Sequence, residues 1–308
     1  MISLRQHAIS LIAVFLALAL GLFLGSGFIG DRVNQLTGTE RDRLGTAEAE
    51  REALARQVNV DQGFLTAVTP ELVGRTLVGK SVLVVTAPTA ADNDTEAVKA
   101  LLGDAGASFS GQIALRTNLV RDENAAKLAT IIDQSVPAGQ QLRTDFSDSG
   151  SRLGDLLGSA LLVREQARPV PEQDRSTVLQ TLRAGGFLDY ADGTVKPADL
   201  VVVMTGGSMP ADSGAEGQLV GRLAAALAQR GEGGVLAGRT GSADGGAPIA
   251  VVRSDPGLGN SLSTVDDVNE QTGRLTVILA LAAEAQGRSG AYGTGQGAAS
   301  ITVSAPGN

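Results

Sequence analysis

The chain of 308 residues contains no cysteine, no tryptophan, one histidine and three methionines. Without cysteine there are no disulfide bonds, so the fold depends on the packing of Leu, Val, Ile and Ala. The single histidine is His7, close to the N-terminus. The residues after it therefore cannot form a Ser-His-Asp or Cys-His nucleophile, nor a zinc site with histidine or cysteine ligands.

Aromatic residues make up 3% of the chain and the formal net charge is −8. Nucleic-acid-binding proteins need basic surfaces, often with stacking aromatic residues, so we expect no nucleic-acid partner. No catalytic motif is recognisable, and we expect a protein that is not an enzyme and has no evident cofactor. Two carboxylates far apart in the sequence could still meet to form a hydrolase site, but nothing singles out such a pair.

One long apolar run is present, and no charged residue lies between Arg5 and Asp31. Residues 8–28 would form a helix about 31 Å long, which matches a hydrocarbon core of about 30 Å. A cleaved signal peptide usually has a shorter apolar region and an A-x-A-like site. We therefore expect residues 1–30 to form a cytoplasmic tip and a transmembrane anchor, with a cleaved signal as the alternative. Either one exports the rest of the chain, so we expect a single-pass cell-membrane protein with an extracytoplasmic C-terminal domain.

Small residues recur every four positions in this run, at Ala13, Ala17, Gly21 and Gly25. Such a stripe lets a second helix approach closely, which predicts a homodimer or a partner helix in the membrane. Chance is the alternative, because small residues are frequent in apolar segments.

Residues 31–68 are rich in charge and are predicted to form a helical stalk. A 3.5-residue spacing connects Leu44, Ala47, Leu54, Val58 and Leu65, and is interrupted by Arg51 and Asp61. This pattern predicts a short coiled coil that pairs two copies or binds another envelope protein. A single solvated helix is the alternative.

Residues 76–290 alternate apolar strands with amphipathic helices. Strands are expected at 81–86, 109–115, 200–204, 235–237 and 249–253, and helices at 95–103, 123–134, 150–163, 171–184, 214–229 and 274–285. This alternation predicts an α/β fold with a mainly parallel sheet. It could be one domain or two similar lobes joined near residues 168–171. Residues 291–308 form a Gly-rich tail with at most one edge strand.

Four short motifs have a chemical and a structural interpretation. A strand followed by Gly-Gly at residues 201–208 (VVVMTGGS) could bind phosphate, but it lacks the P-loop lysine and favours a tight turn. Residues 293–297 (GTGQG) indicate a flexible loop. The acidic groups at 92–94 and 265–270 could hold Ca²⁺ or Mg²⁺. A helix cap at Asp94 and a solvated turn explain them more simply, so the metal ligands, if any, stay unknown.

Several blocks resemble a known family. The blocks are the start of the chain, GDLLGSALL (154–162), VVVMTGG (201–207), STVDDV (263–268), GRLTVILAL (273–281) and YGTGQGAASITVS (292–304). In this order, they are similar to the mycobacterial copper-transport protein B (MctB) family of actinobacterial envelope proteins. The resemblance implies a role in copper efflux or homeostasis, and the family description suggests an outer-membrane location. Some relatives are instead linked to cell-envelope integrity and to wall hydrolysis at division.

Copper enters only through this resemblance. Proteins hold copper with Cys, Met and His side chains, and the exported part of this chain offers Met204 and Met209. The residues alone favour an alternative function, a non-enzymatic envelope scaffold or regulator that acts through its stalk and the surface of its α/β domain.

Overall fold

The computed structural model describes residues 14–18, 28–164, 168–210, 213 and 215–304. The chain divides into two units, residues 1–61 and residues 62–308. In the first unit, residues 14–18 are helical, and a helix that begins at Phe28 extends into the second unit and ends at Val73. This 46-residue helix, α2, covers the whole of the predicted stalk, residues 31–68.

The second unit is an α/β domain. Its elements are β1 (Ser81–Thr86), α3 (Asp92–Asp104), β2 (Ser108–Leu115), η1 (Thr117–Val120), η2 (Asp122–Asn124), α4 (Ala125–Gln134), α5 (Ser149–Leu161), α6 (Glu172–Gly185), β3 (Leu188–Tyr190), β4 (Leu200–Met204), α7 (Glu216–Ala228), β5 (Gly234–Ala237), α8 (Pro248–Ser254), α9 (Pro256–Gly259), β6 (Ser263–Val265), α10 (Gln271–Glu284) and β7 (Ala291–Tyr292).

Seven strands form one sheet in the order β3-β2-β1-β4-β5-β6-β7. All neighbouring strands are parallel except β3, which runs antiparallel to β2. The predicted mainly parallel α/β fold is therefore confirmed. Strands from before and after residues 168–171 pair with one another, since β2 pairs with β3 and β1 pairs with β4, so both halves build the same sheet.

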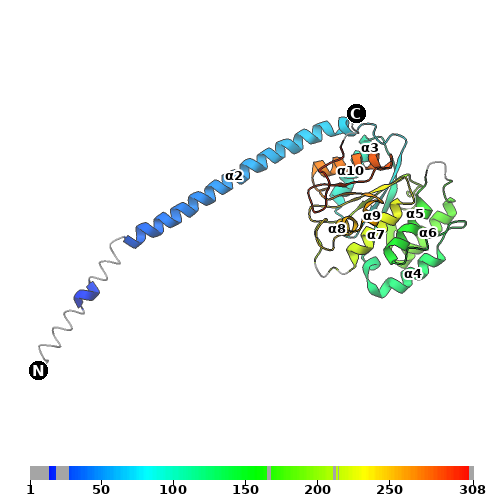
Figure 1. Ribbon diagram of the computed structural model, residues 1–308, viewed down its shortest axis with the longest axis horizontal. Coiled ribbons are helices and arrows are strands. Elements are labelled where there is room, and N and C mark those ends of the chain that lie inside the picture. The colour runs from blue at the N-terminus through cyan, green and yellow to red at the C-terminus, as the bar shows by residue number, and fades with distance from the viewer. Residues whose placement is uncertain (1–13, 19–27, 165–167, 211–212, 214, 305–308) are drawn as a thin grey trace, which may run out of the picture. The chain divides into compact units, whose positions relative to one another are not determined.

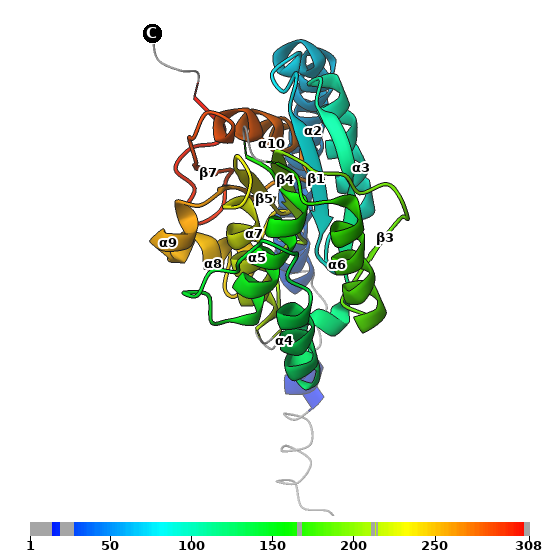
Figure 2. The ribbon, with the colours of Figure 1, turned by 90° about the vertical axis from the view of Figure 1, so that its right-hand side faces the viewer.

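Helices cover both faces of the sheet (Figure 1, Figure 2). Along β4, Leu200, Val202 and Met204 pack into a core with α3 and α10. Val201 and Val203 point to the opposite core, which α4 to α8 supply. Every residue of β4 is buried, which explains why its sequence is a continuous apolar run instead of an alternation of apolar and polar residues.

One expected strand is wrong. Residues 249–253 lie in α8, although their β-branched residues favour a strand. Pro248 occupies the first turn of this helix, where its fixed backbone angle suits a helix start. Ile249 and Val252, three residues apart, are both fully buried in the core beside α7, so the tertiary packing overrides the strand propensity.

Helices α5 and α7 approach each other through a row of glycines. Gly150, Gly154 and Gly158 recur every four residues on α5. A Cβ atom at Gly150 would lie 2.5 Å from the carbonyl oxygen of Leu219, and one at Gly154 would overlap the carbonyl oxygen of Leu223. The missing side chains therefore set the distance between the two helices.

We expect Gly154→Ala to lower the free energy of unfolding by about 1–3 kcal/mol, because an added methyl group must push α5 away from the α7 backbone. Gly103→Ala in α3 is the matched control, since its Cβ would meet nothing within 4 Å. That control should stabilise the helix by about 0.5–1 kcal/mol. Denaturant unfolding of both variants measures the difference, and equal effects would contradict the close approach.

Candidate functional site

The strand order reverses between β1 and β4, and open α/β sheets usually bind ligands outside the carboxyl ends of the strands at such a point. Here the two loops that follow these strands contact each other. The N–H of Gly206 donates to the Thr89 hydroxyl at 3.3 Å, and a Cβ at Gly206 would lie 2.7 Å from the Thr89 carbonyl oxygen. The Gly-Gly segment after β4 therefore lets the two loops lie close together, which agrees with its interpretation as a tight turn.

Asp94 is buried beside this edge and joins three parts of the domain. Its carboxylate pairs with Arg274 of α10 at 3.0 Å and with Arg239, in the loop after β5, at 3.2 Å. Arg274 also donates to the carbonyl oxygens of Val268 and Asn269. The expected role of Asp94 as a helix cap is wrong, because α3 begins earlier, at Asp92. Arginines far along the chain, which no local pattern reveals, bind the carboxylate.

Asp266 forms a second buried ion pair. Its carboxylate lies 2.6 Å from Arg253, whose side chain is 5% exposed. The backbone N–H groups of Thr294 and Gly295 donate to the same carboxylate at 2.9 and 3.0 Å. The Gly-rich segment 293–297, which we expected to be a flexible loop, therefore folds around Asp266. The expectation of a solvated turn at residues 265–270 is wrong, since Asp266 and Asp267 are 1% and 5% exposed.

Asp267 differs from its neighbour because its Oδ1 atom is buried without a hydrogen-bond partner. Burial, together with the adjacent negative charge of Asp266, raises the pKa of Asp267 from 3.8 to about 6. The folded protein therefore holds this proton more tightly than the unfolded chain does, and ionisation of Asp267 destabilises the fold.

We expect wild-type stability to fall as the pH rises from about 4 to about 6 through the titration of Asp267. Asp267→Asn removes this loss and should raise the free energy of unfolding at pH 7.5 by about 1–3 kcal/mol, with little effect at pH 4. Asp145→Asn, at an exposed position, is the control. Thermal unfolding as a function of pH measures both, and a gain that is the same at every pH would contradict this role.

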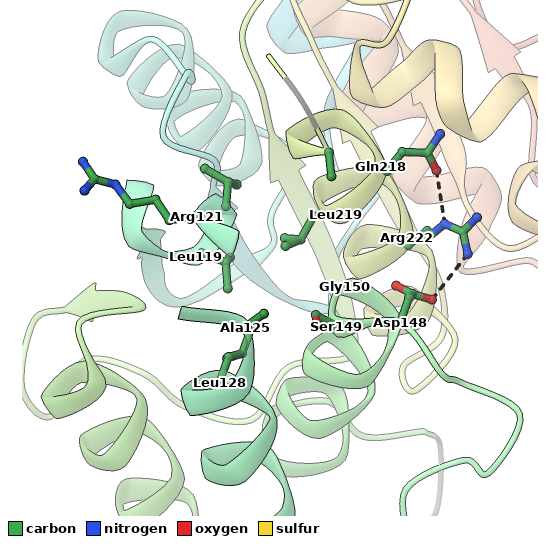
Figure 3. Close-up of a pocket in the computed structure, with 12 residues that line it drawn as sticks. Leu119, Arg121, Ala125, Leu128, Asp148, Ser149, Gly150, Gln218, Leu219 and Arg222 are labelled. Atoms are coloured by element: carbon green, nitrogen blue, oxygen red, sulfur yellow. Dashed lines mark hydrogen bonds and ion pairs between the residues drawn. The ribbon is translucent and has the colours of Figure 1, made fainter. Parts of the chain in front are cut away.

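A cavity of about 410 Å³ opens on the side of the sheet covered by α4, α5 and α7 (Figure 3). Leu119, Leu128 and Leu219 supply apolar walls, and the first turns of α5 and α7 border it. Its volume falls within the range of about 300–1,000 Å³ that is typical of small-molecule sites. Leu119 and Val120, after β2, and Ala215, just before α7, also border the cavity.

The polar side of this cavity is built on Asp148, which caps α5 (Figure 3). Its carboxylate accepts from the N–H of Ser151 at 2.8 Å and lies 3.4 Å from Arg222, which also donates to Gln218. Burial opposes ionisation of Asp148, but the hydrogen bonds from Ser151 and the charge of Arg222 outweigh it and lower the pKa. A carboxylate held ionised by these partners is suited to orient a ligand and is a poor proton acceptor.

Sequence reasoning did not identify this cavity. The one local signal was the segment Asp148-Ser149-Gly150-Ser151, in which an aspartate precedes a helix and accepts a hydrogen bond three residues later. Arg222 and Leu219 come from α7, about 70 residues further along the chain. Only the packing of α7 on α5 brings them to Asp148.

The candidate copper ligands lie close together in sequence but differ in exposure. Met204 is 1% exposed and packs in the core between β4, α3 and α10, whereas Met209, in the loop after β4, is partly exposed. Within the described ranges, no group of three or more His, Asp or Glu side chains could hold a metal ion.

The residues predicted to pair helices are placed only in part. Ala13, Gly21 and Gly25 lie outside the described residues, and Ala17 lies in the exposed helical segment 14–18. Four of the predicted seam residues have described side chains on α2: Ala47, Leu54 and Val58 are exposed, and Leu65 is partly buried. The fifth, Leu44, also lies in α2, but its side chain is not among those that the structure describes. No helix in the part of the chain that the structure describes is both apolar and long enough to span a membrane.

Comparison with known proteins gives one consistent result. The family model "Copper transport outer membrane protein, MctB" matches residues 1–303. The copper transporter MctB of Mycobacterium tuberculosis (strain H37Rv) is 45% identical over 313 residues, which cover 99% of this chain and all of the relative. The copper transporter MctB of Mycobacterium leprae is 42% identical over 315 residues, with 98% and 99% coverage.

Proposed function

The chain belongs to the MctB family, and from this we propose that it acts in copper transport or copper homeostasis at the cell envelope. The observation that carries the proposal is the extent of the similarity. The match to relatives named copper transporters covers essentially the whole chain, including the N-terminal run and the Gly-rich tail.

The amino-acid content limits how this chain can contact copper. Soft or borderline copper ligands are Cys, Met and His, and the sequence contains four such residues in total: Met1, His7, Met204 and Met209. Met204 is enclosed in the core, whereas Met209, in the loop after β4, is partly exposed. We propose that the chain supports copper transport without holding copper in a high-affinity site of its own.

We propose, from the apolar run at its start, that residues 1–30 anchor the chain by a single span and that residues 31–308 lie outside the cytoplasm. The helix α2 then serves as the stalk, in line with its content of charged residues and its length of 46 residues. The family description names an outer-membrane protein, which agrees with an envelope location.

A deletion strain tests the copper function. We expect its copper content, measured by mass spectrometry after growth in raised copper, to exceed that of the parent strain severalfold, and a wild-type copy to restore it. A copy with His7→Gln and Met209→Leu should restore it as well, because the proposal requires no high-affinity site in this chain.

Two results separate the possibilities in this experiment. Unchanged copper content in the deletion strain would end the copper proposal. A deletion phenotype that the wild-type copy rescues and the His7→Gln/Met209→Leu copy does not would show that the chain contacts copper directly.

The second candidate function is a non-enzymatic scaffold or regulator of the envelope. Leu54 and Val58 favour it, because they lie on the predicted seam of α2 and are 63% and 50% exposed. Apolar side chains at a and d positions are buried when two such helices pair. We propose that a second copy of the chain covers them, and a cell-separation defect in the deletion strain with normal copper content would support this function over the first.

The absence of cysteine makes the stalk easy to probe. We expect Leu54→Cys to form a disulfide-linked dimer on intact cells under mild oxidation, because paired helices bring equivalent seam positions together. Val60→Cys is the matched control, since Val60 is 69% exposed but lies off the seam. It should react with a membrane-impermeant maleimide without forming the dimer.

The two variants test pairing and location separately. Equal crosslinking of both variants, or of neither, would contradict a paired stalk. Failure of Val60→Cys to react with the impermeant reagent would contradict the extracytoplasmic location.

A further inference from the structure

A second cavity, of about 280 Å³, lies at the opposite ends of the same helices, where α5 and α7 finish. Four arginines line it: Arg143, Arg164, Arg168 and Arg230. No Asp or Glu is among its lining residues. Such a concentration of positive charge stands out in a chain whose formal net charge is −8.

The charges of these arginines are largely uncompensated. Arg230 pairs with the buried carboxylate of Asp155 at 2.5 Å. Arg143 donates to the side-chain oxygen of Gln229. Arg164 donates to the backbone carbonyl oxygen of the same glutamine at 2.7 Å. These acceptors are neutral, so they orient the guanidinium groups without cancelling their charge.

Arg168 forms no hydrogen bond or ion pair with any residue in the described ranges. Around the cavity, four guanidinium groups therefore face one partner carboxylate, that of Asp155, which leaves three positive charges in excess.

Helix ends do not account for this excess. The carboxyl end of a helix carries a partial charge of about −0.5, so the ends of α5 and α7 together balance about one positive charge. Capping explains the position of Arg164, which donates to the carbonyl oxygen of Gln229 at the C-cap of α7. It does not explain why Arg143 and Arg168 line the same cavity.

We propose that this arginine-lined cavity binds a phosphate group. A guanidinium presents parallel N–H donors that match the oxygens of phosphate, and hydrogen bonds between charged partners are about twice as strong as neutral ones. The volume suits one phosphate with a small substituent. Of the four arginines that line the cavity, Arg143 and Arg230 are partly buried, and Arg164 and Arg168 are exposed.

Calorimetric titration of the full chain in a non-ionic detergent tests this site, with inorganic phosphate as the probe and chloride held at constant ionic strength. We expect saturable binding to one site per chain. Arg143→Gln/Arg168→Gln should weaken it at least tenfold, because it removes two charges but leaves the Arg230–Asp155 pair intact.

Arg152→Gln/Arg288→Gln is the matched control, since it removes two charges from residues that do not line the cavity. Arg143→Lys/Arg168→Lys keeps the charge and should restore part of the affinity, which separates binding from misfolding. Absence of saturable binding, or equal weakening by the pocket and control variants, would overturn the proposal.

The source of the phosphate group can be identified by competition. Displacement of inorganic phosphate by glycerol phosphate indicates a soluble phosphate ester. Displacement by dihexanoyl phosphatidylglycerol but not by glycerol phosphate indicates a lipid headgroup. Both outcomes support the site, and failure of both compounds at concentrations where inorganic phosphate binds would oppose a phosphate-ester ligand.

Discussion

The pairing of β1 with β4 at the centre of the sheet is the contact on which the domain depends. It joins segments 118 positions apart, and the Asp199 carboxylate fixes it by accepting from both the N–H and the hydroxyl of Ser81 at 2.7 Å. On one side of this pair the chain adds β2 and β3, and on the other it adds β5 to β7. Because both faces of these central strands are apolar, helices must cover both, and the three-layer arrangement results.

The glycine row lets α5 and α7 lie close together, and a cavity lies at each end of this helix pair. At their amino ends the helices border the apolar cavity that contains Asp148 and Arg222, and at their carboxyl ends they border the arginine-lined cavity. One close helix pair thus positions both. The buried carboxylates of Asp94 and Asp266 line neither cavity; each is paired with an arginine, and Asp266 also binds the backbone of the C-terminal tail.

The sequence predicted the features that depend on local patterns. The runs at residues 81–86 and 200–204 are strands with these same bounds. The helix predicted at residues 171–184 ends at Gly185, and the next residue, Gly186, has a φ of 82°, the left-handed conformation that glycine favours. Such patterns do not reveal contacts between residues that are distant in the sequence. The sequence around Asp266 is typical of a solvated turn, and only the tertiary structure shows that Arg253 lies beside it. Helix α8 is rich in β-branched residues, and it is helical because α7 covers its apolar face.

Two strands were also missed for a physical reason. β3 and β6 have three residues each, too few to show the alternation of apolar and polar residues that marks a strand. They form because the longer strands β2 and β5 offer them backbone hydrogen-bonding groups. The arginine cavity shares this dependence on tertiary structure, since its four arginines are spread over segments that meet only where α5 and α7 end.

The short outer strands have a consequence for self-association. A sheet edge exposes unpaired N–H and C=O groups that can recruit a strand from another molecule, and proteins limit this hazard by keeping edge strands short. Here the outermost strands are β3, with three residues, and β7, with two. The sheet therefore offers little template for edge-to-edge aggregation between copies of the domain.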